Sequence, residues 1–406
     1  MLYKNVLSNF TWSRERAQMS ALGAFVPRIS SARFARRALT PHARVMSANA
    51  SKSEDEVILV TGATGRVGKE VVARLSAIPG FRVRAATRDK SAYAEALGAH
   101  ETVVFDLEDK STWPGAIRGA TRLFSSTQDK HISQHMEFVK WLGNTPEVRD
   151  SLKHIVRVSC FGADTNTNSY DASIHVSRQN AGIPLMLQHY WWSEECFIEA
   201  GFKEKLTSVR GNFYMNHLLK NELESIKTKG MFTSPLGDCK NSFVACNDMA
   251  EAAVRCFVEG PERHGDKFYD ICGAQSTSMA EVAEILTKAL ATDEAKNVCP
   301  EAHGKRITYV PQDIEQFEQD FGSTRAEFFE YLRNGFYSRC SPDFYNITGK
   351  RPMTYFEYLT TKGAAGDTGL TELFSSQGAL FTNCLLYTSD AADEGLGVDL
   401  GGRRII

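Results

Sequence analysis

Short apolar runs alternate along the chain with segments whose apolar positions repeat at helical spacing. The runs are rich in β-branched side chains, which is typical of buried parallel strands. Strands that alternate with helices indicate βαβ units and an α/β fold with a doubly wound parallel sheet, the Rossmann architecture. Six strands are predicted: Val57–Thr61, Phe81–Thr87, His100–Asp106, Thr121–Thr127, His154–Cys160 and Lys205–Gly211. Helices are predicted at Val67–Leu75, His131–Leu142 and Tyr190–Ala200.

The pattern loosens after about Gly211. Asp266–Gly273 is predicted to be a strand, Ser276–Leu290 a helix with a Ser or Thr cap, and Ala326–Tyr337 an aromatic-rich helix. We therefore expect one folded unit over residues 55–383. Within it, a Rossmann core covers about 55–210 and a smaller α-rich C-terminal lobe, about 211–365, builds the substrate pocket.

Residues 1–54 have the composition of an organelle transit peptide. Met1–Lys52 carries nine basic side chains and one acidic side chain, Glu15, and is rich in Arg, Ser and Ala. Transit peptides are amphipathic and poor in acidic residues. We expect targeting to the mitochondrion, with the plastid as the alternative. If the segment does not target the protein to an organelle, it is a basic disordered tail.

Residues 384–406 show neither helical nor strand periodicity. Their first part, CLLYTSDAADE, matches the in-frame translation of a sequencing adapter. We expect this tail to be adapter read-through and not native sequence, so it is not counted as part of the fold.

Charge and composition argue against several classes of protein. Between the two ends, thirty-six basic side chains stand against forty-four acidic ones, which disfavours a nucleic-acid surface. No apolar run is long enough to span a membrane. The nine cysteines contain no CxxC pair and the ten histidines no HExxH motif, so no metal site is predicted.

A glycine triplet stands between the first strand and the first helix, in VILVTGATGRVGKEVVARL. The first glycine permits a tight turn, the second lets the backbone approach a pyrophosphate, and the third lets helix and strand pack closely. The helix N-terminus then presents free N–H groups to the phosphates. The cofactor-binding residues predicted here are Gly62, Thr64, Gly65, Arg66, Val67 and Gly68.

The end of the second strand indicates which dinucleotide is bound. NAD sites place an acidic residue there to hold the ribose 2′-OH, but Thr87 and Arg88 occupy that place. Arg88 and Arg66 favour a 2′-phosphate, because a guanidinium matches phosphate in geometry and charge. NADP(H) is therefore predicted over NAD(H), with Asp106 and Leu107 near the adenine.

Four segments together resemble the NmrA-like branch of atypical short-chain dehydrogenases: VTGATGRVGKEVV, RVRAATRD, VRGNFYMNHL and NITGKRPMTYFEYL. The resemblance covers about Val57–Lys362. It implies an NADP(H)-binding Rossmann domain with a small α-rich C-terminal lobe. It also implies that Asn212 and Phe213 border the nicotinamide and that Tyr214 and Asn216 face the substrate pocket.

The usual proton-transfer pair of such dehydrogenases is absent from the helix LQHYWWSEECFIEAG. That pair is a Tyr with a Lys four residues later, and the Lys lowers the pKa of the Tyr. Here Glu194 follows Tyr190 at this spacing, where a carboxylate raises the pKa of a Tyr, and Trp192 stands where the family has Lys. The predicted catalytic residues are therefore His189, Tyr190 and Ser159, and Trp192 is assigned to the substrate pocket.

We expect an NADPH-dependent oxidoreductase that reduces a small, flat, apolar substrate such as a quinone or an unsaturated carbonyl. Aromatic side chains at pocket walls suit such substrates. The alternative is a catalytically silent NADP(H)-binding redox sensor or organelle assembly factor that acts through a protein partner. An epimerase-like dehydrogenase is a third hypothesis, and the sequence leaves the oligomeric state open.

Overall fold

A parallel sheet positions every residue of the predicted site. The computed structural model describes residues 56–88, 92–163, 184–217, 219, 222–333 and 335–374. These residues belong to one compact unit that begins at Glu54. The predicted transit segment and adapter tail lie outside the described residues.

In the described part of the chain, seven strands form the main sheet in the order β3-β2-β1-β4-β5-β6-β8. All neighbouring strands are parallel, so the predicted doubly wound α/β fold is confirmed. The order reverses between β1 and β4, and ligands of such sheets bind outside the carboxyl ends of the strands at this point. The strands are β1 Glu56–Val60, β2 Phe81–Thr87, β3 Glu101–Val104, β4 Arg122–Ser125, β5 His154–Cys160, β6 Leu206–Gly211 and β8 Lys267–Ile271.

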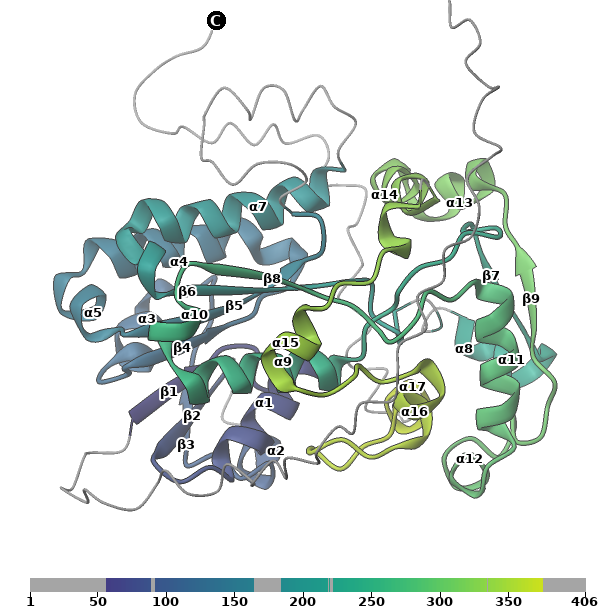
Figure 1. Cartoon of the computed structure of the whole chain (residues 1–406), viewed down its shortest axis with the longest axis horizontal. Coiled ribbons are helices and arrows are strands. Elements are labelled where there is room, and N and C mark those ends of the chain that lie inside the picture. Colours follow the sequence, from purple (N-terminus) through teal and green to yellow (C-terminus); the bar gives the residue numbers. More distant parts are fainter. Residues whose placement is uncertain are drawn as a thin grey trace, which may run out of the picture. The chain divides into compact units, whose positions relative to one another are not determined.

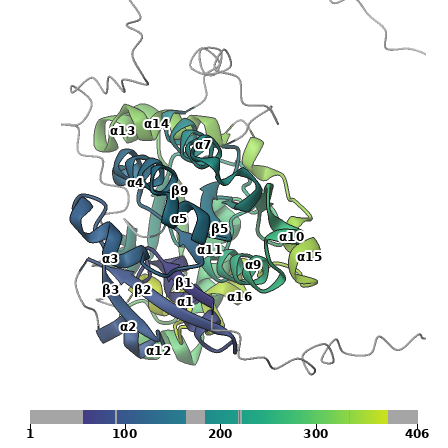
Figure 2. The same ribbon diagram turned by 90° about the vertical axis from the view of Figure 1, so that its left-hand side faces the viewer.

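Helices cover both faces of this sheet. Figure 1 shows α4 and α7 on one face and α1 and α9 on the other, and Figure 2 shows the same arrangement from the side. The helices up to β8 are α1 Arg66–Ser76, α2 Ala92–Ala96, α3 Trp113–Ile117, α4 Ile132–Asn144, α5 Pro146–Ser151, α7 Leu185–Phe197, α8 Leu223–Lys229, α9 Cys246–Glu259 and α10 Pro261–His264.

The first strand lies at the centre of the core. Ile58, Leu59 and Val60 are fully buried. Because side chains of a strand alternate between the faces, Ile58 and Val60 pack with α1 and α9, while Leu59 packs with α3 and α4. A strand that is buried on both faces has a continuous apolar sequence, and VILV is such a run.

The chain beyond residue 211 is shared between the sheet and a smaller α-rich lobe. Lys267–Ile271 pairs with β6 as the last strand of the sheet. Part of the chain after residue 211 therefore belongs to the Rossmann sheet, and the domain boundary near residue 210 stays a prediction. The lobe has its own core and a two-stranded parallel sheet of β7 Met231–Ser234 and β9 Thr308–Pro311. Its helices are α11 Met279–Leu290, α12 Asp293–Val298, α13 Ile314–Phe321, α14 Ser323–Arg333, α16 Tyr355–Thr360 and α17 Gly369–Phe374. Between them, α15 Asp343–Thr348 packs Phe344 and Ile347 into the core of the main sheet beside α9.

Two predicted helices illustrate what local sequence decides. In α11, Ser278 accepts the backbone N–H of Glu281 and the Glu281 carboxylate accepts that of Ser278, a capping box that confirms the predicted cap. The helix predicted at Tyr190–Ala200 is α7, which begins at Leu185 and ends at Phe197. It passes into a wider turn in which Gly201 has φ of 87°.

Candidate functional site

The turn between β1 and α1 requires its glycines. Gly62 has φ of 63°, in the left-handed region that favours glycine. A Cβ on Gly68 would lie 2.0 Å from the carbonyl oxygen of Gly62, so α1 can pack against the strand only with glycine at this position. Gly65 donates its N–H to the same oxygen at 2.8 Å. We call residues 61–68 the glycine turn.

The first turn of α1 offers backbone donors. Gly65 precedes the helix without a side-chain cap, and the first turn has no acidic residue. Such an N-terminus attracts anions through its N–H groups and its dipole. Val67 is 7% exposed and packs in the core, so only its backbone is available to a ligand. Thr64 is half-buried.

Thr61 ties the glycine turn to the neighbouring strand. Its hydroxyl donates to the carbonyl oxygen of Phe124 at 3.0 Å and accepts the N–H of Ser126 at 3.0 Å. The carboxyl ends of β1 and β4 are thereby fixed beside one another at the point where the strand order reverses. The sequence gives no signal for this contact, because Thr61 and Ser126 lie far apart in the chain.

Arg88 and Asp106 follow adjacent strands, as predicted. Arg88 is exposed at the end of β2. Phe105, after β3, donates its N–H to Thr87 at 2.8 Å, which brings Asp106 to the same edge. His131 lies near both: its pKa is lowered first by burial, then by the positive charges of Lys130 and Arg88. His131 was not predicted.

Leu107 and Glu108 complete this edge. Leu107 is half-buried against the core on the α4 face. Glu108 donates its N–H to the Asp106 carboxylate at 3.0 Å, and its own carboxylate lies 3.2 Å from Nδ1 of His131. The edge therefore mixes charges of both signs, with Arg88 as its exposed guanidinium.

Arg66 lies elsewhere. Its Nη1 donates to Oδ1 of Asn216 at 2.9 Å, and Asn216 follows β6, which lies on the opposite side of β1 from β2. The expectation that both guanidinium groups lie around one 2′-phosphate stays a prediction, and Arg88 is the one at the end of β2. Asn216 holds Arg66 through this hydrogen bond.

Glu194 forms a buried ion pair with Arg210. Oε2 of Glu194 lies 2.6 Å from Nη2 of Arg210, and Ser208 donates to Oε1 at 2.5 Å. Burial raises the pKa of Glu194, but Arg210, Ser208 and Ser159 together outweigh burial and hold it below its ordinary value. Ser159, at the carboxyl end of β5, is therefore beside Glu194.

The other predicted catalytic residues lie on different sides of α7. The ring of Tyr190 is 5.8 Å from the guanidinium of Arg157. His189 is 9% exposed, its ring centroid lies 5.5 Å from that of Trp192, and burial lowers its pKa. Ser159 is associated with Glu194 and His189 with Trp192, so their assignment as one catalytic group stays a prediction.

Asn212 anchors the lobe to the end of β6. Its side chain is 1% exposed and donates to Ser242 Oγ at 2.9 Å and to the carbonyl oxygen of Tyr337 at 3.2 Å. Its Oδ1 accepts the N–H of Phe213 at 2.7 Å, and this bond holds the backbone from which the Phe213 ring extends. The side chain of Asn212 is thus used for positioning, and its place beside the nicotinamide stays a prediction.

Aromatic rings from the lobe gather over the carboxyl ends of β5 and β6. The Phe213 ring lies 5.7 Å from Phe328 and 6.1 Å from Phe329. A Cβ on Gly162, after β5, would lie 2.7 Å from the Phe336 ring, so this ring rests directly on the backbone. We call this group the aromatic wall; its members are Phe161, Phe213, Phe328, Phe329 and Phe336.

Tyr214 and His217 adjoin the aromatic wall. Their ring centroids are 5.1 Å apart, and His217 lies 5.5 Å from Phe213. Tyr214 and Asn216 were both predicted to face the substrate. Tyr214 lies with these rings, whereas Asn216 is buried and holds Arg66.

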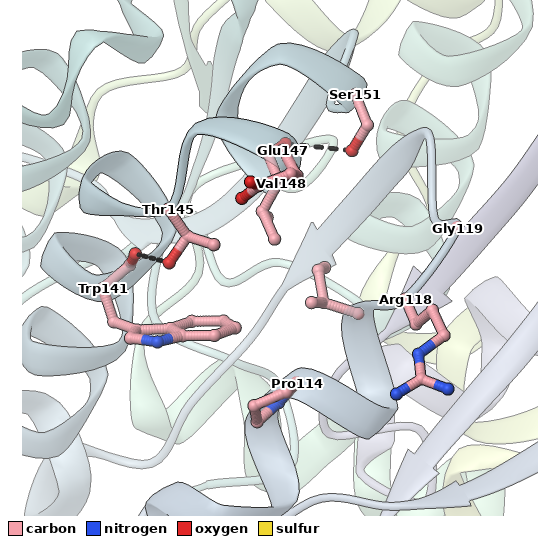
Figure 3. Close-up of a pocket in the computed structure, with 9 residues that line it drawn as sticks. Pro114, Arg118, Gly119, Trp141, Thr145, Glu147, Val148 and Ser151 are labelled. Carbon is pink, nitrogen blue, oxygen red and sulfur yellow. Dashed lines mark hydrogen bonds between the residues drawn. The ribbon is translucent and has the colours of Figure 1, made fainter.

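A hollow of about 260 Å³ opens at the other end of the strands. Figure 3 shows Trp141, Thr145 and Val148 around it, with Thr145 donating to the Trp141 carbonyl oxygen at 2.8 Å. Gly119 precedes β4 and Ser151 precedes β5, so the hollow lies at the amino ends of these strands. It is therefore separate from the glycine turn and the aromatic wall.

No three His, Cys, Asp or Glu side chains in the described part of the chain are grouped to hold a metal ion. No helix there is both long enough and apolar enough to cross a membrane.

Comparison with known proteins adds to this geometry. The sequence profile of the NmrA-like family matches residues 54–328. An NAD(P)H azoreductase of Xenophilus azovorans is 27% identical over 322 residues, which are 76% of this chain and 99% of that protein.

Two solved structures share the fold. The NADPH-dependent quinone oxidoreductase of Escherichia coli, in complex with NADPH, matches with a TM-score of 0.55 and 21% identity, over 74% of this chain and 97% of that one. NmrA, a negative transcriptional regulator in complex with NADP, matches with a TM-score of 0.54 and 17% identity, over 82% of this chain and 100% of that one. At these identities the likeness shows the fold alone.

Proposed function

The chain belongs to the NmrA-like family, and from this premise we propose that it is an NAD(P)H-dependent oxidoreductase. Its cofactor would be NADP(H) in preference to NAD(H). Its substrate would be a small, flat, apolar acceptor such as a quinone or an unsaturated carbonyl, reduced by hydride transfer. The azoreductase and the quinone oxidoreductase among its relatives support this class by their names.

One juxtaposition carries the proposal. The glycine turn and the aromatic wall both stand at the carboxyl ends of strands of one sheet, on the two sides of the point where the strand order reverses. In such sheets a dinucleotide extends across this point. An acceptor beside the far end of that dinucleotide would meet the aromatic wall, and aromatic rings bind flat apolar molecules well.

The residues present fit NADP(H). Gly62, Gly65 and Gly68 keep the glycine turn tight, because a Cβ on Gly65 or Gly68 would lie 3.0 Å or less from the Gly62 carbonyl oxygen, and the first turn of α1 is not capped by a side chain. Arg88 is exposed at the end of β2, where the 2′-phosphate of NADP(H) distinguishes it from NAD(H). The NADP(H)-bound relatives support this preference.

When bound, the nicotinamide supplies the hydride, and the side chains of this chain would hold the acceptor and provide a proton. Glu194 stands four residues after Tyr190, where a Tyr–Lys pair would have its Lys, and its carboxylate is bound to Arg210. Burial lowers the pKa of His189. The proton would come from Tyr190, Ser159, His189 or water.

A second function is favoured by the same helix. Glu194 stands four residues after Tyr190, where catalysis by a Tyr–Lys pair needs a cation. A chain that binds NADP(H) but lacks this pair can report the redox state through a protein partner without turnover. The regulator NmrA among its structural neighbours is consistent with this alternative.

Calorimetric titration of the full chain with NADPH and with NADH tests the cofactor. A panel of quinones and unsaturated carbonyls, followed through the loss of NADPH absorbance, then tests the reaction. Preferential NADPH binding with turnover is the expected result. Tight binding without turnover across the panel would favour the sensor, and no binding of either dinucleotide would contradict the role of the glycine turn.

A further inference from the structure

The segment from Thr361 to Phe374, which we call the C-terminal strap, is fastened to α1. Figure 1 shows the loop between α16 and α17 reaching back toward α1. The Glu70 carboxylate accepts the backbone N–H groups of Ala364 and Ala365 at 2.8 and 2.9 Å. The strap lies beyond residues 54–328, which match the family profile.

Lys69 forms the second fastening. Its ammonium lies 2.6 Å from Asp367 and 2.8 Å from Glu372. The side chains of Lys69 and Glu372 are only 7% and 10% exposed. Burial alone lowers the pKa of Lys69, but the two carboxylates outweigh burial and hold it above its ordinary value. Burying a cation costs free energy unless carboxylates lie close to it in good geometry. Asp367 and Glu372 must therefore stay beside Lys69, and this holds the strap on the helix.

From this point hydrogen bonds lead back to the glycine turn. Oε2 of Glu372 accepts the Tyr358 hydroxyl at 2.5 Å and Nδ2 of Asn216 at 3.3 Å. Oδ1 of the same Asn216 accepts Nη1 of Arg66 at 2.9 Å. Arg66 is the first residue of α1 and directly follows Gly65. The strap is thus joined through two hydrogen bonds to the side chain of Arg66 in the glycine turn.

We propose that Glu372 and Asn216 are positioning residues that hold the Arg66 guanidinium beside the glycine turn, so that the C-terminal strap sets the affinity for the cofactor's diphosphate. This inference rests on the proposed function, because it requires that a dinucleotide binds at the turn. A held guanidinium loses less conformational entropy on binding and can donate two parallel hydrogen bonds to phosphate.

Charge compensation supports this role. A carboxylate beside a diphosphate site would ordinarily repel the ligand. Here Lys69 lies between Glu372 and Asp367 and offsets their charge, while Arg66 remains the cation on the side of the turn. The strap can therefore position Arg66 without presenting an uncompensated negative charge to the phosphates.

Two variants break the connection at different places. Glu372→Gln removes the charge that holds Lys69 and Asn216. Asn216→Ala removes the bond to Arg66 and leaves the ion pair between Lys69 and Glu372 in place, so it keeps the inference testable if Glu372→Gln does not fold. We expect each variant to raise the Kd for NADPH and for NADH about tenfold, as for the loss of a hydrogen bond to a charged group. Adenosine 2′,5′-bisphosphate, which has no diphosphate bridge, should bind as it does to the unaltered chain.

Glu70→Gln is the matched control. Glu70 fastens the same strap to the same helix, but has no hydrogen bond to Arg66 or Asn216 among the contacts of the described residues. We expect it to lower the melting temperature while the Kd for NADPH stays within about twofold. Calorimetry and thermal melts of the four full-length chains measure both quantities.

Three results would overturn the inference. If Glu70→Gln weakens NADPH binding as much as Asn216→Ala, the strap acts only through stability. If Glu372→Gln binds NADPH more tightly, its carboxylate repels the diphosphate and does not position Arg66. If adenosine 2′,5′-bisphosphate loses affinity equally, the effect is not on the diphosphate. Failure of the unaltered chain to bind any dinucleotide is a different outcome, since it contradicts the proposed function and removes this inference with it.

Discussion

The glycine turn and the aromatic wall stand at the same edge of the sheet but are assembled in different ways. The turn is made from neighbouring residues: Gly65 donates to Gly62, and Gly68 packs against Gly62. The wall joins Phe213, which follows β6, to Phe328 and Phe329 of α14. Backbone geometry therefore defines the first region, and packing between the sheet and the lobe defines the second.

Because of this difference, we expect the two regions to differ in how many substitutions they tolerate. The glycine turn accepts few substitutions, because a Cβ on Gly68 would clash with the carbonyl oxygen of Gly62. A wall of rings can be repacked with other apolar residues at modest cost. We expect changes in the glycine turn to abolish cofactor binding and changes in the aromatic wall to alter the choice of substrate.

The largest effect is expected from Gly68→Ala. The added Cβ would meet the carbonyl oxygen of Gly62 at 2.0 Å, so α1 must move away from the turn. We expect the Kd for NADPH to rise at least about a hundredfold and the free energy of unfolding to fall by about 1–3 kcal/mol, as for other overpacked sites. Calorimetry and denaturant titration measure the two quantities.

Gly115→Ala serves as its control. Gly115 lies in α3, and a Cβ there meets no atom within 4 Å. The change should leave NADPH binding unaltered and stabilise the chain by up to about 1 kcal/mol, because alanine is the better helix former. Unchanged NADPH affinity in Gly68→Ala would show that the cofactor does not use this turn.

The second-largest effect is expected at Arg88, at the predicted 2′-phosphate site. Arg88→Ala removes the guanidinium at the end of β2, and we expect NADPH affinity to fall about tenfold to a hundredfold, as for a charged hydrogen bond. NADH affinity should change by no more than about twofold, since NADH lacks the 2′-phosphate. Titrations with both dinucleotides give the ratio.

Arg82→Ala removes an exposed arginine from the same strand. It controls for the general effect of charge on an anionic ligand. If both arginine variants weaken NADPH and NADH alike, Arg88 is not the residue that selects the cofactor.

The sequence predicted the glycine turn because all its determinants are contiguous. Strand, glycine spacing and helix period follow one another in a single segment, and β2 and β5 were predicted with the bounds that the structure has. The Ser278 cap of α11 was also predictable, because a capping box spans four neighbouring positions.

The aromatic wall and the strap could not be predicted in this way. The aromatic helix predicted at Ala326–Tyr337 corresponds to α14, which ends at Arg333. The partners of this segment, Phe161 and Phe213, are brought to it only by the tertiary fold. Arg66 is predicted to lie near the 2′-phosphate from its place in the motif, but its hydrogen-bond partner Asn216 is distant in the chain. Pairings of this kind depend on packing and have no local signal.

A pH effect tests the joint between α9 and the lobe. Asp248 accepts the N–H of Met353 at 2.8 Å, and burial raises its pKa to about 7, above the ordinary value of 3.8. A carboxyl with a raised pKa in the folded state contributes stability that is fully present below its unfolded pKa and is lost as the pH rises through the folded pKa. We therefore expect this contribution to fall between about pH 4 and about pH 7.

Asp248→Asn keeps the acceptor oxygen and cannot ionise. Relative to the unaltered chain, its free energy of unfolding should increase by about 2 kcal/mol between about pH 5 and about pH 8. Denaturant titrations at both pH values measure the difference. A difference that is independent of pH would mean that Asp248 is ionised throughout this range.

The smallest effect concerns the aromatic wall. Phe329→Leu keeps an apolar side chain but removes ring contacts with Phe213 and Phe317. Aromatic pairs contribute about 0.5–1.5 kcal/mol beyond their buried area, so we expect the KM for a flat acceptor to rise about threefold. The Kd for NADPH should stay the same, because Phe329 does not belong to the glycine turn. Phe356→Leu, at a ring that is 39% exposed on α16, should change neither quantity. If Phe329→Leu instead weakens NADPH binding and leaves the KM unaltered, the wall belongs to the cofactor site, and the two regions are not separate in function.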